Sequence, residues 1–406
     1  MSDSSRRLRG LLARAGLVLA VLFAGVATVA VERMPERFGL QLVTPAWMPQ
    51  QIAKLVEFAN DVQVAFVVDR APAEHGTLAL VLVREQTLED LPYLSPIDRG
   101  LMARLVRAVD AMGPRVIGLD FVFDQATEPA KDRALESAIA QARARVVLGG
   151  IDERTPLSDR RRTWQRAFLA RTGRPAGYFN LRYDAQEASG QPIIRYRAGP
   201  SADPQFPLSF AEAVASAAEV APWSPGASRR IAWLGKPENG GETFLAIEAG
   251  AVLAAAAEPS GPLATVLRTR LSGKIVVVGA DFPDRDRHPT PMTLFDDTGM
   301  AGVEVHAHIL AALLDRRRLD DLDAPWRPVL MFLAAGLGFL AGWLARASPG
   351  GLAVAGLVGM MLVGGVSMAM LWQLRTIVPI GTVAALFFAG VIGGRLVGRF
   401  ASRPGR

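Results

Sequence analysis

The sequence contains no cysteine, and this absence excludes several kinds of chemistry. The chain has no thiolate nucleophile, no thiol redox switch and no cysteine ligand for a metal. It forms no disulfide, so any domain outside the cytoplasm must be stabilised by its core alone. Nearly 300 residues separate the first long apolar run from the second. That is enough chain to build a large core, as one domain or as two lobes.

Aspartate, glutamate and lysine are absent from four long apolar runs. These runs are residues 15–31, 328–345, 351–374 and 377–394. Each is about as long as a helix needs to cross a bilayer core of ~30 Å. Transporters and channels place ionisable residues in such helices, so transport is disfavoured. Glycine pairs at small-xxx-small spacing, such as Gly338/Gly342 and Gly390/Gly394, instead indicate close helix packing. We predict four transmembrane helices.

Excess positive charge is missing from the long segment between the runs. Residues 32–327 carry a net charge of −3, whereas the remaining segments carry +9. The domain itself is therefore not basic, which argues against nucleic acid as a partner. Nine arginines flank the runs on one side of the expected topology, and only Arg375 lies in the opposite turn; the nine are Arg6, Arg7, Arg9, Arg14, Arg346, Arg395, Arg399, Arg403 and Arg406. Since such residues favour the cytoplasmic side, we expect cytoplasmic tails at 1–14 and 395–406 and an extracytoplasmic domain at 32–327.

The first apolar run has a second interpretation, a cleaved signal peptide. Basic residues precede it, and small residues occur near Thr28-Val29-Ala30. We favour a retained anchor, because the run is as long as a span and no clear Ala-x-Ala site follows it. Under either interpretation the large domain leaves the cytoplasm.

Short β-branched runs alternate with helical stretches in the large domain. The expected strands are 62–68, 78–83, 116–119, 145–148, 193–196 and 275–278, and the expected helices are 45–60, 96–112, 131–144, 207–220, 263–271 and 300–314. This alternation predicts βαβ units, and hence an α/β extracytoplasmic domain with a mostly parallel sheet. Ligands of such sheets bind beyond the carboxyl ends of the strands. Asp120, Asp124 and Asp281 follow two of the expected strands there.

Two stretches of the domain resemble the CHASE-two extracytoplasmic sensory domains of bacterial signalling proteins. The first contains a D-x-x-F turn, Asp120 to Phe123, and a helix-opening Asp132. The second contains a G-K-I-V-x-x-G strand at 273–279, the pair Thr290-Pro291 and a G-V-E-x-H-A helix start at 302–307. The resemblance implies a sensory receptor in the bacterial inner membrane, with its large domain in the periplasm.

The sequence also departs from this family pattern. The early strand lacks the family's paired acids, and the family's W-P-W-P-R turn is reduced to 95–99, which keeps one proline and Arg99. Family members commonly continue into a cytoplasmic kinase or cyclase domain, whereas 12 residues remain here from Arg395 onward. We therefore expect the signal to pass to a protein partner, either a separate protein or a second copy.

The candidate ligand-binding residues are Asp120, Asp124, Asp281, Arg99, Thr290 and His306. Asp120, Asp124, Glu128 and Asp132 could instead hold a hard cation, although helix capping explains them more simply. A second acidic cluster, 281–288, lies near His306 and His308 in sequence. These two histidines point about 200° apart on a helix, so they cannot share one metal ion, but one of them together with His288 and an aspartate remains an alternative metal site. Sensing of acidity by a histidine is a further alternative.

The sequence favours a membrane-anchored sensor over two other classes. The runner-up is an extracytoplasmic enzyme, but no catalytic triad or metal motif stands out, and Gly273-Lys274 lacks the phosphate-loop pattern. The third class is a scaffold that docks a partner protein without sensing a ligand. We predict no catalytic residue and no cofactor, and an unidentified small ligand.

Overall fold

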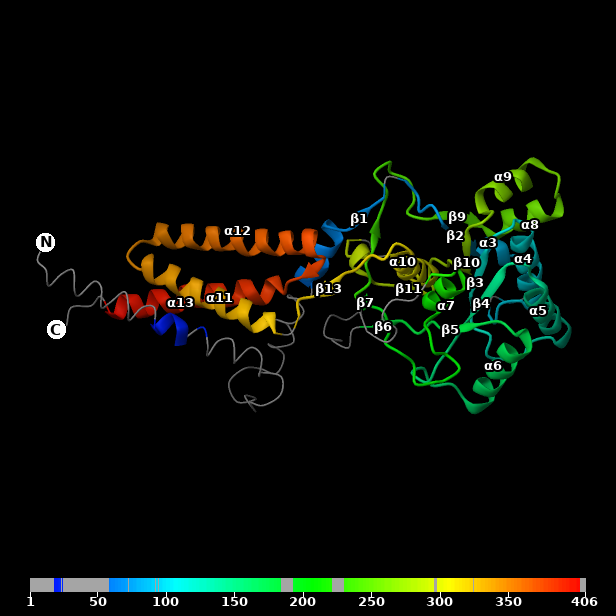
Figure 1. Ribbon diagram of the computed structural model, residues 1–406, viewed down its shortest axis with the longest axis horizontal. Coiled ribbons are helices and arrows are strands. Elements are labelled where there is room, and N and C mark those ends of the chain that lie inside the picture. Colours follow the sequence, from blue (N-terminus) through cyan, green and yellow to red (C-terminus); the bar gives the residue numbers. More distant parts are fainter. Residues whose placement is uncertain are drawn as a thin grey trace, which may run out of the picture. The chain divides into compact units, whose positions relative to one another are not determined.

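Figure 1 shows the helices and strands of the protein in a computed structural model. The structure describes residues 18–22, 24, 58–71, 73–91, 93, 95–183, 193–220, 230–295, 298–323 and 325–401. Two compact units divide the chain. The α/β unit comprises Val68–Glu187 and Gln191–Arg318. The helical unit comprises Met1–Val67, Ala188–Gly190 and Leu319–Arg406.

A six-stranded sheet forms the centre of the α/β unit. Its order is β5-β4-β3-β10-β2-β9, and every neighbouring pair is parallel. The strands are β2 (Leu78–Val83), β3 (Val116–Asp120), β4 (Arg145–Gly150), β5 (Ala176–Tyr178), β9 (Leu245–Glu248) and β10 (Ile275–Ala280). At its centre, Val277 of β10 aligns with Leu80 of β2 and Gly118 of β3. The predicted α/β domain with a mostly parallel sheet is confirmed.

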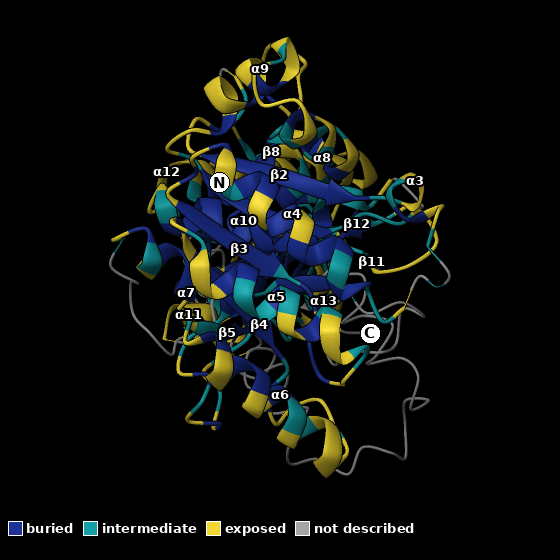
Figure 2. Ribbon diagram, turned by 90° about the vertical axis from the view of Figure 1, so that its right-hand side faces the viewer, coloured by how far each residue is buried: buried dark blue, intermediate teal, exposed yellow. Residues whose placement is uncertain are grey.

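Helices cover both faces of this sheet, so its central strands are buried (dark blue in Figure 2). The helices are α3 (Glu85–Leu88), α4 (Arg99–Ala111), α5 (Pro129–Gln141), α6 (Asp159–Thr172), α7 (Phe210–Ala217), α8 (Ala249–Ala257), α9 (Pro262–Leu271) and α10 (Gly302–Leu314). Helices α4, α5 and α8 share one core cluster with strand residues, and α7 and α10 pack together and against the strands. Burial on both faces explains why the strands are continuous apolar runs.

Side-chain caps fix several helix starts. Asp98 accepts a hydrogen bond of 2.7 Å from the Leu101 backbone N–H at the start of α4. Ser209 and Glu212 form a capping box at the start of α7. Each cap satisfies backbone donors that have no partner within the helix. Helix α4 thus begins at Arg99, whereas the sequence had indicated a start at residue 96.

Short strand pairs complete the α/β unit. β1 (Asp69–Arg70) pairs in parallel with β8 (Leu234–Gly235), while β6 (Arg182–Tyr183) pairs antiparallel with β7 (Ile194–Tyr196). β11 (Arg287–His288) and β12 (Met300–Ala301) form an antiparallel pair, and the 3-10 helix η2 (Pro291–Thr293) lies between them in sequence. These last elements position the loop that follows β10.

Three long apolar helices form the described core of the helical unit. They are α11 (Trp326–Leu344), α12 (Pro349–Leu374) and α13 (Ile380–Ala401), and their length and composition suit membrane spans. The short strands β13 (Asp320–Asp321) and β14 (Thr376–Ile377) pair in parallel. The described part of the chain therefore contains three candidate spans instead of four. Of the expected span 15–31, residues 18–22 and 24 are helical, and the rest lies outside the described residues.

Two further expectations for this unit need correction. The last apolar helix does not begin at residue 377, because Thr376 and Ile377 pair with β13; it starts at Ile380 and continues to Ala401. The stretch 62–68 is not a strand, since residues 58–66 are helical. Its β-branched residues are overridden by packing, as Val64 is buried and Gln63 accepts a hydrogen bond of 2.5 Å from Ser367 of α12. Of the expected helix 45–60, residues 45–57 lie outside the described residues.

Glycines bring α11 and α13 into backbone contact. A Cβ on Gly338 would lie 2.0 Å from the Phe387 carbonyl oxygen, and one on Gly394 would lie 1.9 Å from the Phe339 carbonyl oxygen. Gly342 and Gly390 face the partner helix in the same way. The predicted role of these glycines in close packing is confirmed. They serve an interface within one chain.

Candidate functional site

A cavity of about 630 Å³ opens in the α/β unit at the carboxyl edge of the sheet. Its lining comes from segments that follow β2, β3, β4, β5 and β10, and from α6 and α10. The lining residues include Asp120, Phe121, Val122, Asp124, Ile151, Phe179, Asn180, Leu181, Phe282, Asp284, Arg285, Asp286, His288 and His306. The cavity therefore lies where parallel α/β sheets bind their ligands, as the sequence analysis expected.

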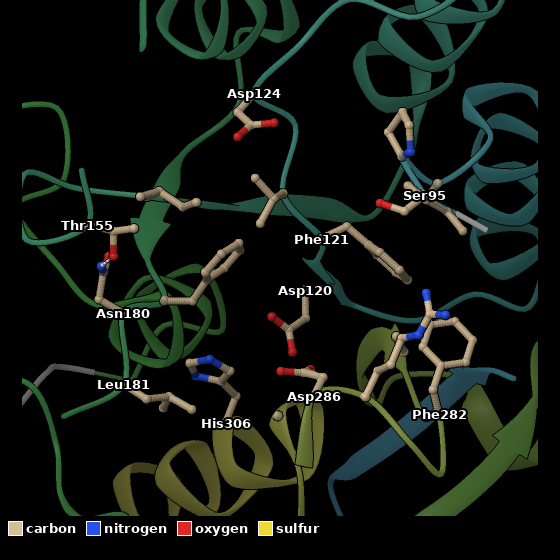
Figure 3. A pocket seen from close by; sticks show the side chains of 18 of the residues that line it. Ser95, Asp120, Phe121, Asp124, Thr155, Asn180, Leu181, Phe282, Asp286 and His306 are labelled. Atoms are coloured by element: carbon tan, nitrogen blue, oxygen red, sulfur yellow. Dashed lines mark hydrogen bonds between the residues drawn. The ribbon is translucent and has the colours of Figure 1, made fainter. Parts of the chain in front are cut away.

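Two carboxyl groups face one another on the floor of this cavity. Figure 3 shows Asp120, at the end of β3, pointing toward Asp286, with His306 beside them. Burial and the charge of Asp286 raise the pKa of Asp120 to about 8. Within the described residues, no side chain or backbone group makes a hydrogen bond or ion pair with the Asp120 carboxyl. Asp120 is thus a protonated, unpartnered acid at neutral pH.

Asp286 is held in the opposite, ionised state. A hydrogen bond of 2.9 Å with Nε2 of His288 lowers the pKa of Asp286, and His306 and Arg287 add to this effect against the opposing effect of burial. Gly302, the first residue of α10, makes room for the carboxylate, because a Cβ there would lie 2.6 Å from Oδ2 of Asp286. The site therefore pairs one neutral acid with one carboxylate.

His306 is a neutral member of the floor. Burial lowers the pKa of His306 to about 4, although Asp286 opposes this shift, and the ring makes a hydrogen bond with the Phe179 backbone. The imidazole also packs edge-on against Phe210, with ring centroids 5.5 Å apart. A group that titrates near pH 4 is a poor sensor of neutral pH, so this alternative is not supported for His306.

His308 occupies different surroundings, as helix geometry predicts. Its Nδ1 accepts a hydrogen bond of 3.2 Å from the Leu234 backbone, and its ring packs against Trp233 and Phe244. Burial lowers the pKa of His308 to about 3. The two histidines do not converge. Across the described ranges, no group of three histidine, aspartate or glutamate side chains is placed to hold a metal ion.

The walls of the cavity combine aromatic rings with arginines that already have acidic partners. Phe121 and Phe282 stand beside the two carboxyl groups in Figure 3, and Phe179 also contributes to the lining. Arg161 forms an ion pair with Asp124. Arg285 lies 3.5 Å from a carboxylate oxygen of Asp284. The arrangement suits a small molecule with an apolar body and a polar end that reaches the floor.

Three of the six residues predicted to bind ligand line the cavity, namely Asp120, Asp124 and His306. The other three have structural contacts outside the lining. Asp281 is paired with Arg84 at 2.9 Å and Arg287 at 2.6 Å. The backbone N–H of Thr290 donates to Oγ1 of Thr293 in a turn.

Arg99 is fully buried, and it does not line the cavity. Its guanidinium lies 4.6 Å from the centroid of the Phe123 ring and 3.8 Å from an oxygen of Asp132. Asp132 also accepts hydrogen bonds from Thr127 near the start of α5. Asp132 thus lies in the first turn of α5 and binds the residue before the N-cap Glu128, which itself makes no side-chain cap.

Sequence reasoning missed Asp286 and the aromatic walls as parts of the site. Asp286 belongs to the acidic stretch 281–288, but nothing in its spacing separates it from Asp281 or Asp284. Its left-handed backbone, with φ of +53°, and the following antiparallel pair β11–β12 direct it toward Asp120. A glycine at 302 was the available signal, since it allows the close approach of a carboxylate.

Comparison with protein families gives one match. The model of the family described as the CHASE2 domain matches residues 39–345, which include the whole cavity. No match was found among the curated proteins or among the solved structures.

Proposed function

The chain belongs to the CHASE2 family of extracytoplasmic sensory domains, and from this membership we propose that it is a membrane-anchored sensor module. In this proposal the cavity binds a small ligand outside the cytoplasm, and the bound state is passed to a partner protein. The observation that carries the proposal is the cavity itself. It lies at the ligand-binding edge of a parallel sheet, and a neutral acid, a carboxylate and aromatic rings converge there.

The proposed location is a bacterial inner membrane, with the α/β unit in the periplasm and both termini in the cytoplasm. Three apolar helices support membrane anchoring. The short segments outside 32–327 hold the excess of arginine, which supports this orientation. The family's extracytoplasmic character agrees with it.

The proposed output is a contact with a protein, either a separate signalling protein or a second copy of the chain. A ligand shifts a receptor only by binding one conformation better than another, so the shift must reach something with an activity. Helix α12 offers a surface for this contact. Within the helical unit it leaves large apolar side chains exposed, including Leu357 and Met361, which is 66% exposed. Such a surface faces lipid or the spans of another protein.

An extracytoplasmic enzyme is the second candidate function. The observation that favours it is the opposite shift of two neighbouring carboxyl pKa values, which is also the arrangement of an acid–base pair. We place sensing first because the chain belongs to a sensory family. Loss of a reaction in Asp120→Asn, in a protein shown to have turnover, would reverse this order.

A cavity-filling variant tests the proposed function in the membrane. Val122 lines the cavity and is 36% exposed, so Val122→Trp should block the site without disturbing the core. Val266→Trp on the exposed face of α9 is the matched control. A photo-crosslinking residue at Met361 then reports on the partner contact of α12 in the full chain.

We expect Val122→Trp to change the yield or identity of the crosslinked product, and Val266→Trp to leave both as in the wild type. Crosslinking that is the same in all three proteins would contradict a sensor, and would favour a scaffold that docks its partner regardless of the cavity.

A further inference from the structure

We propose that the ligand of this cavity is an organic cation, a small ammonium compound with an apolar, aromatic body. The inference rests on the proposed function, and it names the chemical class that the sensor recognises. It follows from three features of the cavity, which are the balance of charge along the lining, an acid without a partner, and the aromatic walls.

Acids outnumber bases along the lining. The ionisable groups that face the cavity, taken from every element around it, are Glu85, Asp120, Asp124, Arg161, Asp284, Arg285, Asp286, His288 and His306. Both arginines already have acidic partners, Asp124 and Asp284. An anionic ligand would share each arginine with its carboxylate and approach the charge of Asp286. A cationic ligand meets a favourable field without any rearrangement.

The floor also lacks hydrogen-bond donors toward Asp120. The Asp120 carboxyl has no partner within the described residues, and Asp286 receives a hydrogen bond from His288 on Oδ1. Asp120 is partly exposed to the cavity, so its unpartnered carboxyl can accept a hydrogen bond from a donor on the ligand. An ammonium group carries three donors and a positive charge, so it can bind both carboxyl groups at once.

The walls fit the remainder of such a molecule. Phe121 and Phe282 stand beside the two acids in Figure 3, and Phe179 also lines the cavity. Aromatic faces attract cations and also bury apolar groups. The volume of about 630 Å³ lies within the usual size range of small-molecule sites. A metal ion fits less well, because no three ligand side chains converge within the described ranges.

Three probes of similar shape and different charge test the inference. They are 2-phenylethylamine (a cation), 2-phenylethanol (neutral) and 3-phenylpropanoate (an anion), and each is titrated by calorimetry into the full chain in lipid nanodiscs. We expect the amine to bind at least about tenfold more tightly than the other two. Asp286→Asn should lower the affinity for the amine by about tenfold or more. Asp90 is an exposed acid outside the lining, so Asp90→Asn should bind the amine as tightly as the wild type does.

The pH dependence of binding gives a second, independent readout. An ammonium group bound beside Asp120 favours the ionised carboxylate, so binding releases a proton. The affinity should therefore rise between about pH 6 and pH 8, a range in which an alkylammonium stays charged. Asp120→Asn should remove this rise. Val122→Trp, which changes no acid, should abolish binding at every pH.

The cationic class would be overturned if the alcohol or the carboxylate bound as tightly as the amine or more tightly, or if none of the three probes bound. An unchanged affinity of Asp286→Asn for the amine would overturn it as well. These failures are distinct from failure of the proposed function. If no amine binds but Val122→Trp still alters the crosslinking of α12, the sensor stands and the ligand class is wrong. If the amine binds as expected and that crosslinking never changes, the ligand class stands and the sensor proposal is wrong.

Discussion

Asp286 and Asp120 form an asymmetric pair of acids across the floor of the cavity. Burial and the charge of Asp286 raise the pKa of Asp120 to about 8, while the hydrogen bond from His288 lowers the pKa of Asp286. One acid is therefore protonated and the other ionised at neutral pH. The pair couples the protonation of the site to any charge that enters the cavity.

Asp120→Asn is predicted to change how the stability of the α/β unit depends on pH. The pKa of an aspartate in the unfolded chain is ~3.9. Between about pH 4 and pH 8 the folded protein therefore keeps a proton on Asp120 that the unfolded chain has already lost. Its contribution to stability is complete below about pH 4, and it is lost as the pH rises toward 8. The variant does not suffer this loss. We expect the difference in Tm, variant minus wild type, to grow from pH 5 to pH 8 and then to level off.

Thermal unfolding of the full chain in detergent over this pH range provides the measurement. The control is Asp90→Asn, an exposed residue outside the cavity, whose profile should run parallel to that of the wild type. A constant offset for Asp120→Asn at all pH values would show that Asp120 is ionised in the folded protein.

The sheet and the edge of the sheet where the cavity lies could be predicted from the sequence, because both follow from local sequence patterns. Strands buried on both faces are continuous apolar runs, as in β2 and β10, and residues after them meet at one edge. Asp120 and Asp124 could be assigned on that basis. Asp286 could not, because its position depends on a left-handed turn and on the glycine that opens α10. Neither feature is visible in a hydrophobic pattern.

Gly177 is predicted to be essential for the contact between β5 and α7. A Cβ at this position would lie 2.6 Å from the Ser209 carbonyl oxygen and 2.7 Å from the backbone of Phe210. Backbone atoms cannot move aside as a side chain can, so Gly177→Ala should lower the free energy of unfolding by about 1–3 kcal/mol. Urea unfolding of the full chain in detergent, followed by circular dichroism, measures the loss.

Gly250→Ala is the matched control for this prediction. It lies in α8 with no atom within 4 Å of its added Cβ, so the change should be neutral or stabilising by up to about 1 kcal/mol. Equal stability of the Gly177 and Gly250 variants would show that β5 and α7 are not in backbone contact.

Gly338→Ala is predicted to weaken the packing of α11 against α13. The added Cβ would lie 2.0 Å from the Phe387 carbonyl oxygen, which forces the helices apart. Gly364→Ala in α12 should have no such effect, because nothing lies within 4 Å of that position. In SDS titrations of the purified chain, the Gly338 variant should unfold at a lower SDS fraction than the wild type. Identical midpoints for both variants would contradict the close helix contact.

The ends of the helices and the helix at 58–66 show what the sequence could not provide. Apolar composition located three spans, but not the start of α13, which is set by the pairing of β14 with β13. The β-branched residues at 62–68 favour a strand in isolation. Burial of Val64 and the bond from Ser367 to Gln63 favour the helix instead, and these contacts involve residues far apart in the chain.

The most direct test of the account is whether solvent outside the cytoplasm reaches the cavity. The natural chain has no cysteine, so single cysteines at Val122, in the cavity lining, and at Ala347, in the exposed turn between α11 and α12, are unique labels. Spheroplasts that express either variant are treated with a membrane-impermeant maleimide. The account predicts that Val122→Cys is labelled in intact spheroplasts and that Ala347→Cys is labelled only after permeabilisation. Labelling of Ala347→Cys but not of Val122→Cys in intact spheroplasts would contradict it.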